Sequence, residues 1–488
     1  MLKLPGWSQG SDSAAYAITA DISTAKVSAV VPASPGAPAD GTVDAVTVTV
    51  KDANGNRVGN AAVSLSATNG ATLQESVTTD AQGQATAPLS SKKAGAVKVT
   101  AKVAGGKDAG QTATVTFTAG APAQAASGVK TDKASYAAGS DMTVTVTLKD
   151  ANGNPVAGQA ALLTAEAVTV ANASLSGSWK ENGAGTYAAG YTAITAGTGL
   201  KAVLKLPGWS QGSDSAAYAI TADISTAKVS AVVPASPGAP ADGTVDAVTV
   251  TVKDANGNRV GNAAVSLSAT NGATLKESVT TDAQGQATAP LSSKKAGAVK
   301  VTAKVAGGKD AGQTATVTFT AGAPAQAASG VKTDKASYAA GSDMTVTVTL
   351  KDANGNPVAG QASLLTAEAV TVANASLSGS WKENGAGIYT AGYTAITAGT
   401  GLKAGVKLPG WSKGSDSAAY VITAGAPAQA ASGVKTDKAS YAAGSDMTVT
   451  VTLKDANGNP VAGQATSLTA EAVTVANATL SGRWTDNQ

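Results

Sequence analysis

Hydrophobic and polar residues alternate along the segment 45–65, and the same pattern returns through the chain. Val46, Val48 and Val50 alternate with threonines, which is typical of a β-strand with one buried face. The segment 52–56, with the sequence DANGN, then interrupts the alternation with residues that tolerate turn conformations. This turn and its preceding lysine recur after Lys149, Lys253, Lys351 and Lys454. Five copies of one strand-and-turn pattern indicate an array of repeated domains.

A longer repeat sets the size of these domains. The segment from Leu2 to Ala20 recurs as Leu204 to Ala222, an offset of 202 residues. This period fits two domains of about 100 residues each, the size of an immunoglobulin-like sandwich. We expect type A domains at 21–119 and 223–321, type B domains at 120–222 and 322–424, and incomplete type B domains at 1–20 and 425–488.

The alternation predicts an all-β fold of tandem immunoglobulin-like β-sandwich domains in a linear array. In type A we expect seven strands, at 26–31, 43–51, 61–67, 71–78, 84–90, 96–103 and 111–118. Phe117 and Phe319, the two phenylalanines, lie in the last of these strands and should fill the core. In type B, a strand at 142–148 leads into the turn. Its core should be richer in aromatic residues, namely Trp179, Tyr187, Tyr191, Trp209 and Tyr218.

Composition narrows the class of function. The net charge of +3 is spread evenly, so no basic face for nucleic acid is expected. No apolar run is long enough to span a bilayer, and the first ten residues lack the apolar stretch of a signal peptide. The pattern starts and stops inside type B domains, so we expect an internal segment of a longer reading frame. Cysteine and histidine are absent, which removes disulfides and the commonest zinc and nucleophile–base sites.

The turn at 52–56 begins like a calcium-binding loop. Such a loop needs glycine at its sixth position and an acidic residue at its twelfth, where this chain has Arg57 and Val63. We therefore interpret the segment as a β-turn, with calcium held by aspartates at the domain joints as the alternative. No pair of acids or nucleophile with a base recurs in a catalytic pattern, so we expect no enzyme activity, no catalytic residues, no metal and no cofactor.

Tryptophan in a Pro-Gly turn is the one motif that suggests direct binding. It occurs at Trp7, Trp209 and Trp411. An exposed indole could stack on a sugar or a partner, whereas packing over the sandwich edge is the structural alternative. Two alternatives to a purely architectural role follow: direct binding of a glycan or matrix protein through these turns, and weak self-association between chains.

Type A resembles the group 1 bacterial immunoglobulin-like (Big-1) domain of the intimin and invasin family. The residues that carry the resemblance are 39–41 (ADG), 51–56 (KDANGN), 66–71 (SATNGA), 79–85 (TDAQGQA) and 93–95 (KAG). Type B resembles the related invasin-type domain through 132–136 (DKASY) and 149–156 (KDANGNPV).

The resemblance implies a passenger segment of an inverse autotransporter on the outer membrane of a Gram-negative bacterium. In that family a β-barrel exports tandem sandwiches that form a stalk. The stalk presents an adhesive tip to a host cell-surface protein or glycan. Barrel and tip have no counterpart in this sequence, so membrane attachment and receptor contact would lie in other parts of a longer protein. We expect a spacer role, with four complete domains spanning on the order of 150 Å.

Overall fold

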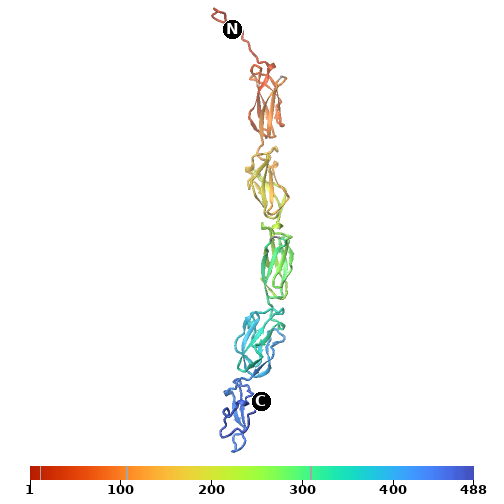
Figure 1. Cartoon of the computed structure of the whole chain (residues 1–488). Coiled ribbons are helices and arrows are strands. Elements are labelled where there is room, and N and C mark those ends of the chain that lie inside the picture. The colour runs from red at the N-terminus through yellow and green to blue at the C-terminus, as the bar shows by residue number, and fades with distance from the viewer. Residues whose placement is uncertain (11, 106–107, 308–309, 488) are drawn as a thin grey trace. The chain divides into compact units, whose positions relative to one another are not determined.

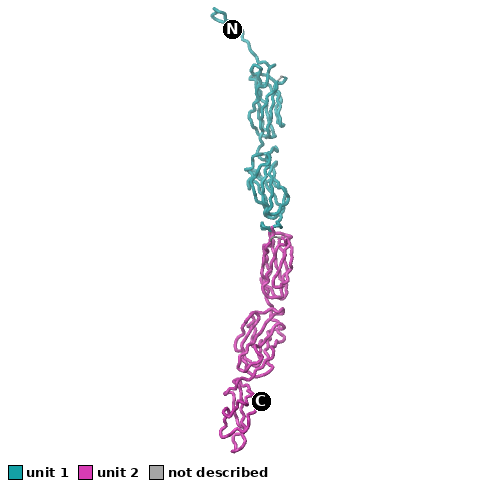
Figure 2. The backbone as a smooth tube through the Cα atoms, viewed as in Figure 1, with its two compact units in different colours: residues 1–225, 254–258 teal, residues 226–253, 259–488 magenta. Residues whose placement is uncertain are grey.

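The structure is a computed structural model that describes residues 1–10, 12–105, 108–307 and 310–487. Ser11 and Gln488, which fall in the two predicted end segments, lie outside the described residues. The chain forms two compact units, Met1–Ser225 with Asp254–Asn258, and Thr226–Lys253 with Arg259–Gln488 (Figure 2). Figure 1 shows successive β-sandwiches along the chain. The described residues hold strands and short 3₁₀ helices, and no α-helix among them could cross a membrane.

The first type A domain packs two sheets face to face. Its strands are β1 (Lys26–Pro32), β2 (Gly36–Pro38), β3 (Asp44–Lys51), β4 (Ala62–Ala67), β5 (Thr72–Leu73), β6 (Ser76–Thr78), β7 (Gln84–Ser90), β8 (Gly95–Val103) and β9 (Gln111–Thr118), after the 3₁₀ helix η1 (Ile22–Thr24). One sheet has the order β1-β3-β7-β5 and the other β2-β9-β8-β4-β6. The immunoglobulin-like sandwich expected from the alternation is thereby confirmed.

Alternation along each strand decides which side chains enter the type A core. In β3, Val46, Val48 and Val50 are fully buried, while the intervening threonines are only half-buried. Phe117 is 1% exposed at the end of β9, as predicted. Aliphatic side chains from both sheets therefore meet in a thin core that is closed by one aromatic ring.

Two features of the type A sheets differ from the prediction. The strand expected at 71–78 is wrong as a single element, because its two halves join opposite sheets. β5 pairs with β7, whereas β6 pairs with β4. The short strand β2 was not predicted. It pairs in parallel with β9, and its Pro38 marks an edge position where no ladder N–H is needed.

The second unit repeats this sandwich with the same topology. Its elements are η4 (Ile224–Thr226, which spans the unit boundary), β21 (Lys228–Pro234), β22 (Gly238–Pro240), β23 (Asp246–Lys253), β24 (Ala264–Ala269), β25 (Thr274–Leu275), β26 (Ser278–Thr280), β27 (Gln286–Ser292), β28 (Gly297–Val305) and β29 (Gln313–Thr320). Phe319 is 1% exposed, like its counterpart.

The first type B domain divides its strands among three sheets, with orders β10-β12-β16-β14, β11-β20-β17 and β13-β18-β19, and β15 pairs with β16. The elements are η2 (Gln124–Ala126), β10 (Gly128–Thr131), β11 (Ser135–Ala137), β12 (Asp141–Thr147), η3 (Ala160–Leu162), β13 (Val168–Val170), β14 (Ala173–Leu175), β15 (Lys180–Gly183), β16 (Thr186–Ala193), β17 (Gly197–Leu200), β18 (Ala202–Leu204), β19 (Ser213–Asp214) and β20 (Tyr218–Thr221).

The second type B domain has the same three sheets. Its elements are η5 (Gln326–Ala328), β30 (Gly330–Thr333), β31 (Ser337–Ala339), β32 (Asp343–Thr349), η6 (Ala362–Leu364), β33 (Val370–Val372), β34 (Ala375–Leu377), β35 (Lys382–Gly385), β36 (Ile388–Ala395), β37 (Gly399–Leu402), β38 (Ala404–Val406), β39 (Ser415–Asp416) and β40 (Tyr420–Thr423).

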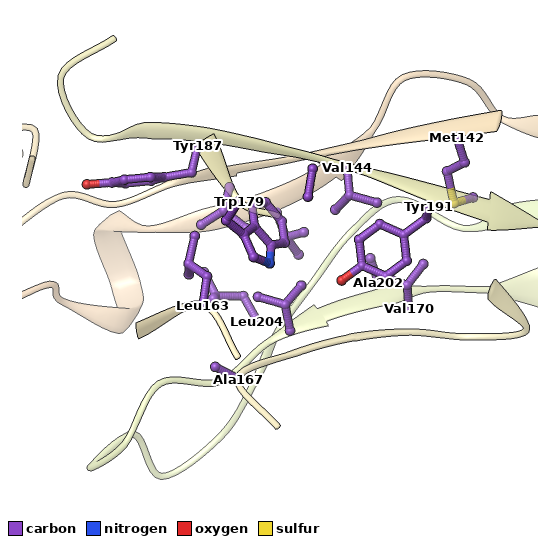
Figure 3. Close-up of a cluster of buried hydrophobic side chains, with 14 of the residues drawn as sticks. Met142, Val144, Leu163, Ala167, Val170, Trp179, Tyr187, Tyr191, Ala202 and Leu204 are labelled. Atoms are coloured by element: carbon purple, nitrogen blue, oxygen red, sulfur yellow. The ribbon is translucent and has the colours of Figure 1, made fainter. Parts of the chain in front are cut away.

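Aromatic rings fill the type B core (Figure 3). Trp179, Tyr187 and Tyr191 are buried, and the rings of Trp179 and Tyr191 meet edge-on with centroids 6.4 Å apart. Tyr218 is also buried, while Trp209 is half-buried against the same cluster. Four of the five predicted aromatic residues thus lie in the core, and the fifth lies at its margin.

The two end segments expose residues whose counterparts are buried. Tyr16 is 80% exposed, whereas the matching Tyr218 is 2% exposed. In the last segment, Val434 is 63% exposed, whereas the matching Val129 is 8% exposed. The described part of the last segment forms a sheet of two strands, β41 (Gly433–Thr436) and β42 (Val449–Thr452), with η7 (Gln429–Ala431) and η8 (Ala465–Ser467).

Candidate functional site: the domain joints and the tryptophan turns

A polar cluster that recurs through the chain is the five-residue segment DANGN, which we call the Asp–Asn turn. It occupies 52–56, 150–154, 254–258, 352–356 and 455–459. In the first type B domain, Asp150 Oδ1 accepts the N–H groups of Asn152 and Asn154, each at 2.9 Å. Gly153 between them adopts a φ of 85°, a conformation that glycine reaches without steric cost. The motif therefore closes a tight turn, as predicted.

Asp150 also fastens the linker that enters its domain. Its Oδ2 atom accepts the N–H of Gly120 at 3.0 Å and the side-chain amide of Asn154 at 2.9 Å. Burial raises the pKa of Asp150, but the donors of Asn154, Gly120 and Asn152 lower this pKa by more, so it lies below the usual aspartate value. The carboxylate is charged at neutral pH and faces N–H donors, which is the environment of a hydrogen-bond acceptor rather than of a cation ligand.

The amide of Asn154 joins two domains. Its Oδ1 accepts the N–H of Ala94 at 2.8 Å, and its Nδ2 donates to the carbonyl oxygen of Lys92 at 2.9 Å. Both partners belong to the loop before β8 in the preceding type A domain. Asn152 adds a second bond across the joint, from its Nδ2 to the carbonyl oxygen of Ala39 at 2.9 Å. The turn is therefore an interdomain contact as well as a local bend.

Turns that contact a preceding domain, which we call docked, are more buried than a turn without such a contact. Asp150 is 3% exposed and Asn154 is 6% exposed. In the first type A domain, Asn56 is exposed and its amide donates to Asp52, within its own turn, at 3.0 Å. The sequence of the two turns is the same, so burial of the asparagine reflects the domain that packs against it.

The sequence predicts the turn but not its contact with the neighbouring domain. A signal was present, because types A and B differ over most of their length yet share KDANGN. A turn needs only residues that tolerate bending. Retention of both asparagines in two dissimilar domains indicates a second demand on their side chains.

The tryptophan turns lie beside the same joints. Trp209 is half-buried, and its indole Nε1 donates to the carbonyl oxygen of Pro122 in the linker at 3.3 Å. Trp411 makes the equivalent bond to Pro324 at 3.1 Å. Trp7 is 45% exposed. The structure thus packs two of the three indoles over the sandwich edge, and binding of a partner by these turns stays a prediction.

A groove of about 860 Å³ opens next to Trp411 within the second unit. Its walls come from the linker, from the segment after the Asp–Asn turn and from the tryptophan turn, and they include Pro324, Pro357, Gln361, Leu364, Pro409 and Trp411. Among the described residues, no group of three or more acidic, histidine or cysteine side chains could hold a metal ion.

Comparison with known proteins identifies the domain types. The group 1 bacterial immunoglobulin-like domain matches residues 27–118 and 229–320, and domain 3 of invasin matches residues 325–425. The inverse autotransporter adhesin YeeJ of Escherichia coli strain K12 is 31% identical over 238 residues, which is 47% of this chain and 10% of that protein. The match therefore spans about a tenth of the length of this curated relative.

Solved structures of adhesins are also similar. The Escherichia coli adhesin FdeC is 27% identical, with 63% of this chain and 100% of that chain covered and a TM-score of 0.38. Invasin, described as a bacterial integrin-binding protein, is 20% identical, with coverage of 86% and 81% and a TM-score of 0.34. With both domain types matched, the chain belongs to the intimin and invasin family and consists of tandem immunoglobulin-like domains of that family.

Proposed function

We propose that this chain is a non-enzymatic stalk segment of a bacterial surface adhesin, which extends an adhesive tip from the outer membrane. The observation that carries the proposal is the joint at Asn154, where a buried amide and a buried carboxylate bind both the linker and the preceding domain. Opening the joint would give up these hydrogen bonds, each of which contributes about 0.5–1.5 kcal/mol net when water replaces the partner. Joints of this kind would limit bending, and the number of domains would then set the reach.

The proposed setting follows from the relatives. They are adhesins by name, and one is an inverse autotransporter. We place the whole protein at the cell surface, where its tip would contact a host cell-surface protein or glycan. In this assignment the described domains serve as a spacer, and recognition belongs to other parts of the protein.

Deletion of one A–B pair, residues 21–222, tests the spacer role. The maximum dimension from small-angle X-ray scattering should fall by about 70–80 Å, because each domain contributes roughly 35–40 Å along its strands. Duplication of the same pair is the matched control and should add an equal length. A maximum dimension that does not follow domain number would overturn the proposal, as would a scattering profile without a rod-like cross-section.

The groove beside Trp411 favours a second candidate function, direct binding of a glycan or matrix protein. An indole edge and an amide from Gln361 are groups that could contact a sugar. Trp411→Ala and Trp209→Ala variants should then lose binding on a glycan array, while Trp7→Ala should retain it. Equal binding by all three variants would refute this candidate and leave the spacer role intact.

A further inference from the structure

The amide of the docked asparagine contacts only main-chain atoms of the preceding domain. At the first A–B joint these are the carbonyl of Lys92 and the N–H of Ala94, two residues apart. At the second A–B joint, Asn356 binds the carbonyl of Lys294 at 2.9 Å and the N–H of Ala296 at 2.8 Å. We call this carbonyl and N–H, in residues i and i+2, the main-chain pair.

A type B domain offers the same main-chain pair. Where one type B domain follows another, Asn459 binds the carbonyl of Ile396 at 2.7 Å and the N–H of Ala398 at 2.8 Å. Within the first unit, Asn258 binds the carbonyl of Ile194 and the N–H of Ala196, both at 2.8 Å. In both types the pair lies in the loop directly before a strand that begins with glycine, β8 or β28 in type A and β17 or β37 in type B.

The first two residues of the two loops differ, and the Ala-Gly that follows is shared, while the docked geometry is the same. Type A has Lys-Lys-Ala-Gly at 92–95, and type B has Ile-Thr-Ala-Gly at 194–197. A charged lysine and an apolar isoleucine thus occupy the same position without changing the bonds to the asparagine. Recognition through main-chain atoms carries little information about the side chains of the partner.

The linker is held in the same general way. Gly120, Gly322 and Gly425 donate their N–H groups to Oδ2 of the aspartate in the following turn, at 2.8–3.0 Å. In type A the equivalent donor is the N–H of Asp223, which reaches Asp254 at 3.0 Å. A linker of either sequence therefore satisfies the aspartate with a main-chain group.

We propose that the Asp–Asn turn is a general docking element, which accepts any preceding immunoglobulin-like domain that presents the main-chain pair, whatever its type. The turn fixes the joint, and the order of domains along the chain is free. This inference concerns the joint itself and does not depend on the role of the chain as a spacer.

The proposal can be tested with an order of domains that this chain does not contain. Deletion of 120–222 joins Ala119 to Asp223, and the local sequence Thr-Ala-Asp is the same as in the natural type B to type A junction. The result is a type A domain followed directly by another type A domain. Asn258 should then bind the main-chain pair of Lys92 and Ala94. The rest of the 488-residue chain is left in place.

Distance measurements report on the new joint. Since the chain has no cysteine, spin labels can be placed specifically at Thr112→Cys and Val245→Cys, which replace exposed residues. Double electron–electron resonance should give a narrow distance distribution in the deletion variant. Adding Asn258→Ala should abolish the narrow distribution, because both bonds to the main-chain pair are lost.

The control is Asn56→Ala in the same labelled protein. It removes the equivalent bond within the turn at Asp52, where the asparagine is exposed, and should leave the distribution unchanged. Circular dichroism of each variant checks that the sandwiches remain folded. A broad distribution in the deletion variant with folded domains would overturn the proposal, and so would a narrow one that survives Asn258→Ala.

Discussion

Removal of one hydroxyl group, in Tyr187→Phe, should destabilise the first type B domain measurably. The Tyr187 hydroxyl donates to the carbonyl oxygen of Val156 at 2.7 Å and accepts the N–H of Gln159 at 3.0 Å. Both partners lie in the segment that directly follows the Asp–Asn turn. The ring itself is fully buried, so phenylalanine fills the same space (Figure 3).

The expected cost comes from the two groups left behind. The buried carbonyl left without a partner costs about 1–3 kcal/mol, and the partly buried N–H adds less because water can reach it. A domain of this size has an m-value of about 1–3 kcal/mol per molar urea, so the midpoint should fall by about 1 M. Tyr191→Phe is the matched control, because that ring is 4% exposed and its hydroxyl has no hydrogen bond among the described residues.

Tryptophan fluorescence can follow this unfolding selectively. The type A domains contain neither tryptophan nor tyrosine, so the signal comes from type B domains and the end segments. In Tyr187→Phe, the part of the transition due to the first type B domain should move to lower urea. The second type B domain, with Tyr389 intact, remains as an internal reference. Equal midpoints for Tyr187→Phe and Tyr191→Phe would refute the reasoning.

Three further predictions concern acid, backbone geometry and the type A core. Burial raises the pKa of Asp455, but hydrogen bonds from Asn459, Gly425 and Asn457 lower it by more, to about 2. The stabilisation of the joint by this carboxylate is therefore present above the usual aspartate pKa and is lost as the pH falls through about 2. Labels across the joint should keep a narrow distance distribution at about pH 4 and lose it near pH 2. Gly185→Ala should lower the urea midpoint more than Gly153→Ala: both residues have positive φ, but only at Gly185 would the new Cβ lie 2.6 Å from a carbonyl oxygen, that of Leu148. Phe117→Ala should cost about 3–5 kcal/mol and appear in circular dichroism, while the tryptophan fluorescence transition stays in place.

The sequence predicts the sandwiches well because strand alternation is a local property. Val46, Val48 and Val50 point to one face whatever surrounds them, and this face must be buried. The sequence does not show that β5 and β6 join opposite sheets, since both short strands retain an alternating pattern. It depends on which neighbours, β7 or β4, lie within hydrogen-bonding distance after folding.

The joint was the least predictable part of the candidate site. The sequence around Asn154 predicts a turn residue. Its role across the joint depends on a partner about 60 residues earlier in the chain. That partner is a main-chain N–H, which every residue except proline possesses. A contact of this kind has no complementary side chain on the other domain, so pairing of charges or of apolar patches could not have located it.

Parallel pairing of an early strand with the last strand has a mechanical consequence. In type A, β2 lies parallel to β9, with bonds from Ala39 to Thr118 and from Thr116 to Pro35. In type B, β11 lies parallel to β20. Tension applied to the two ends of a domain pulls these strands in opposite directions along their length. The bonds between them then share the load and must break together, so each domain should withstand flow or traction better than a sandwich whose end strands peel apart one bond at a time.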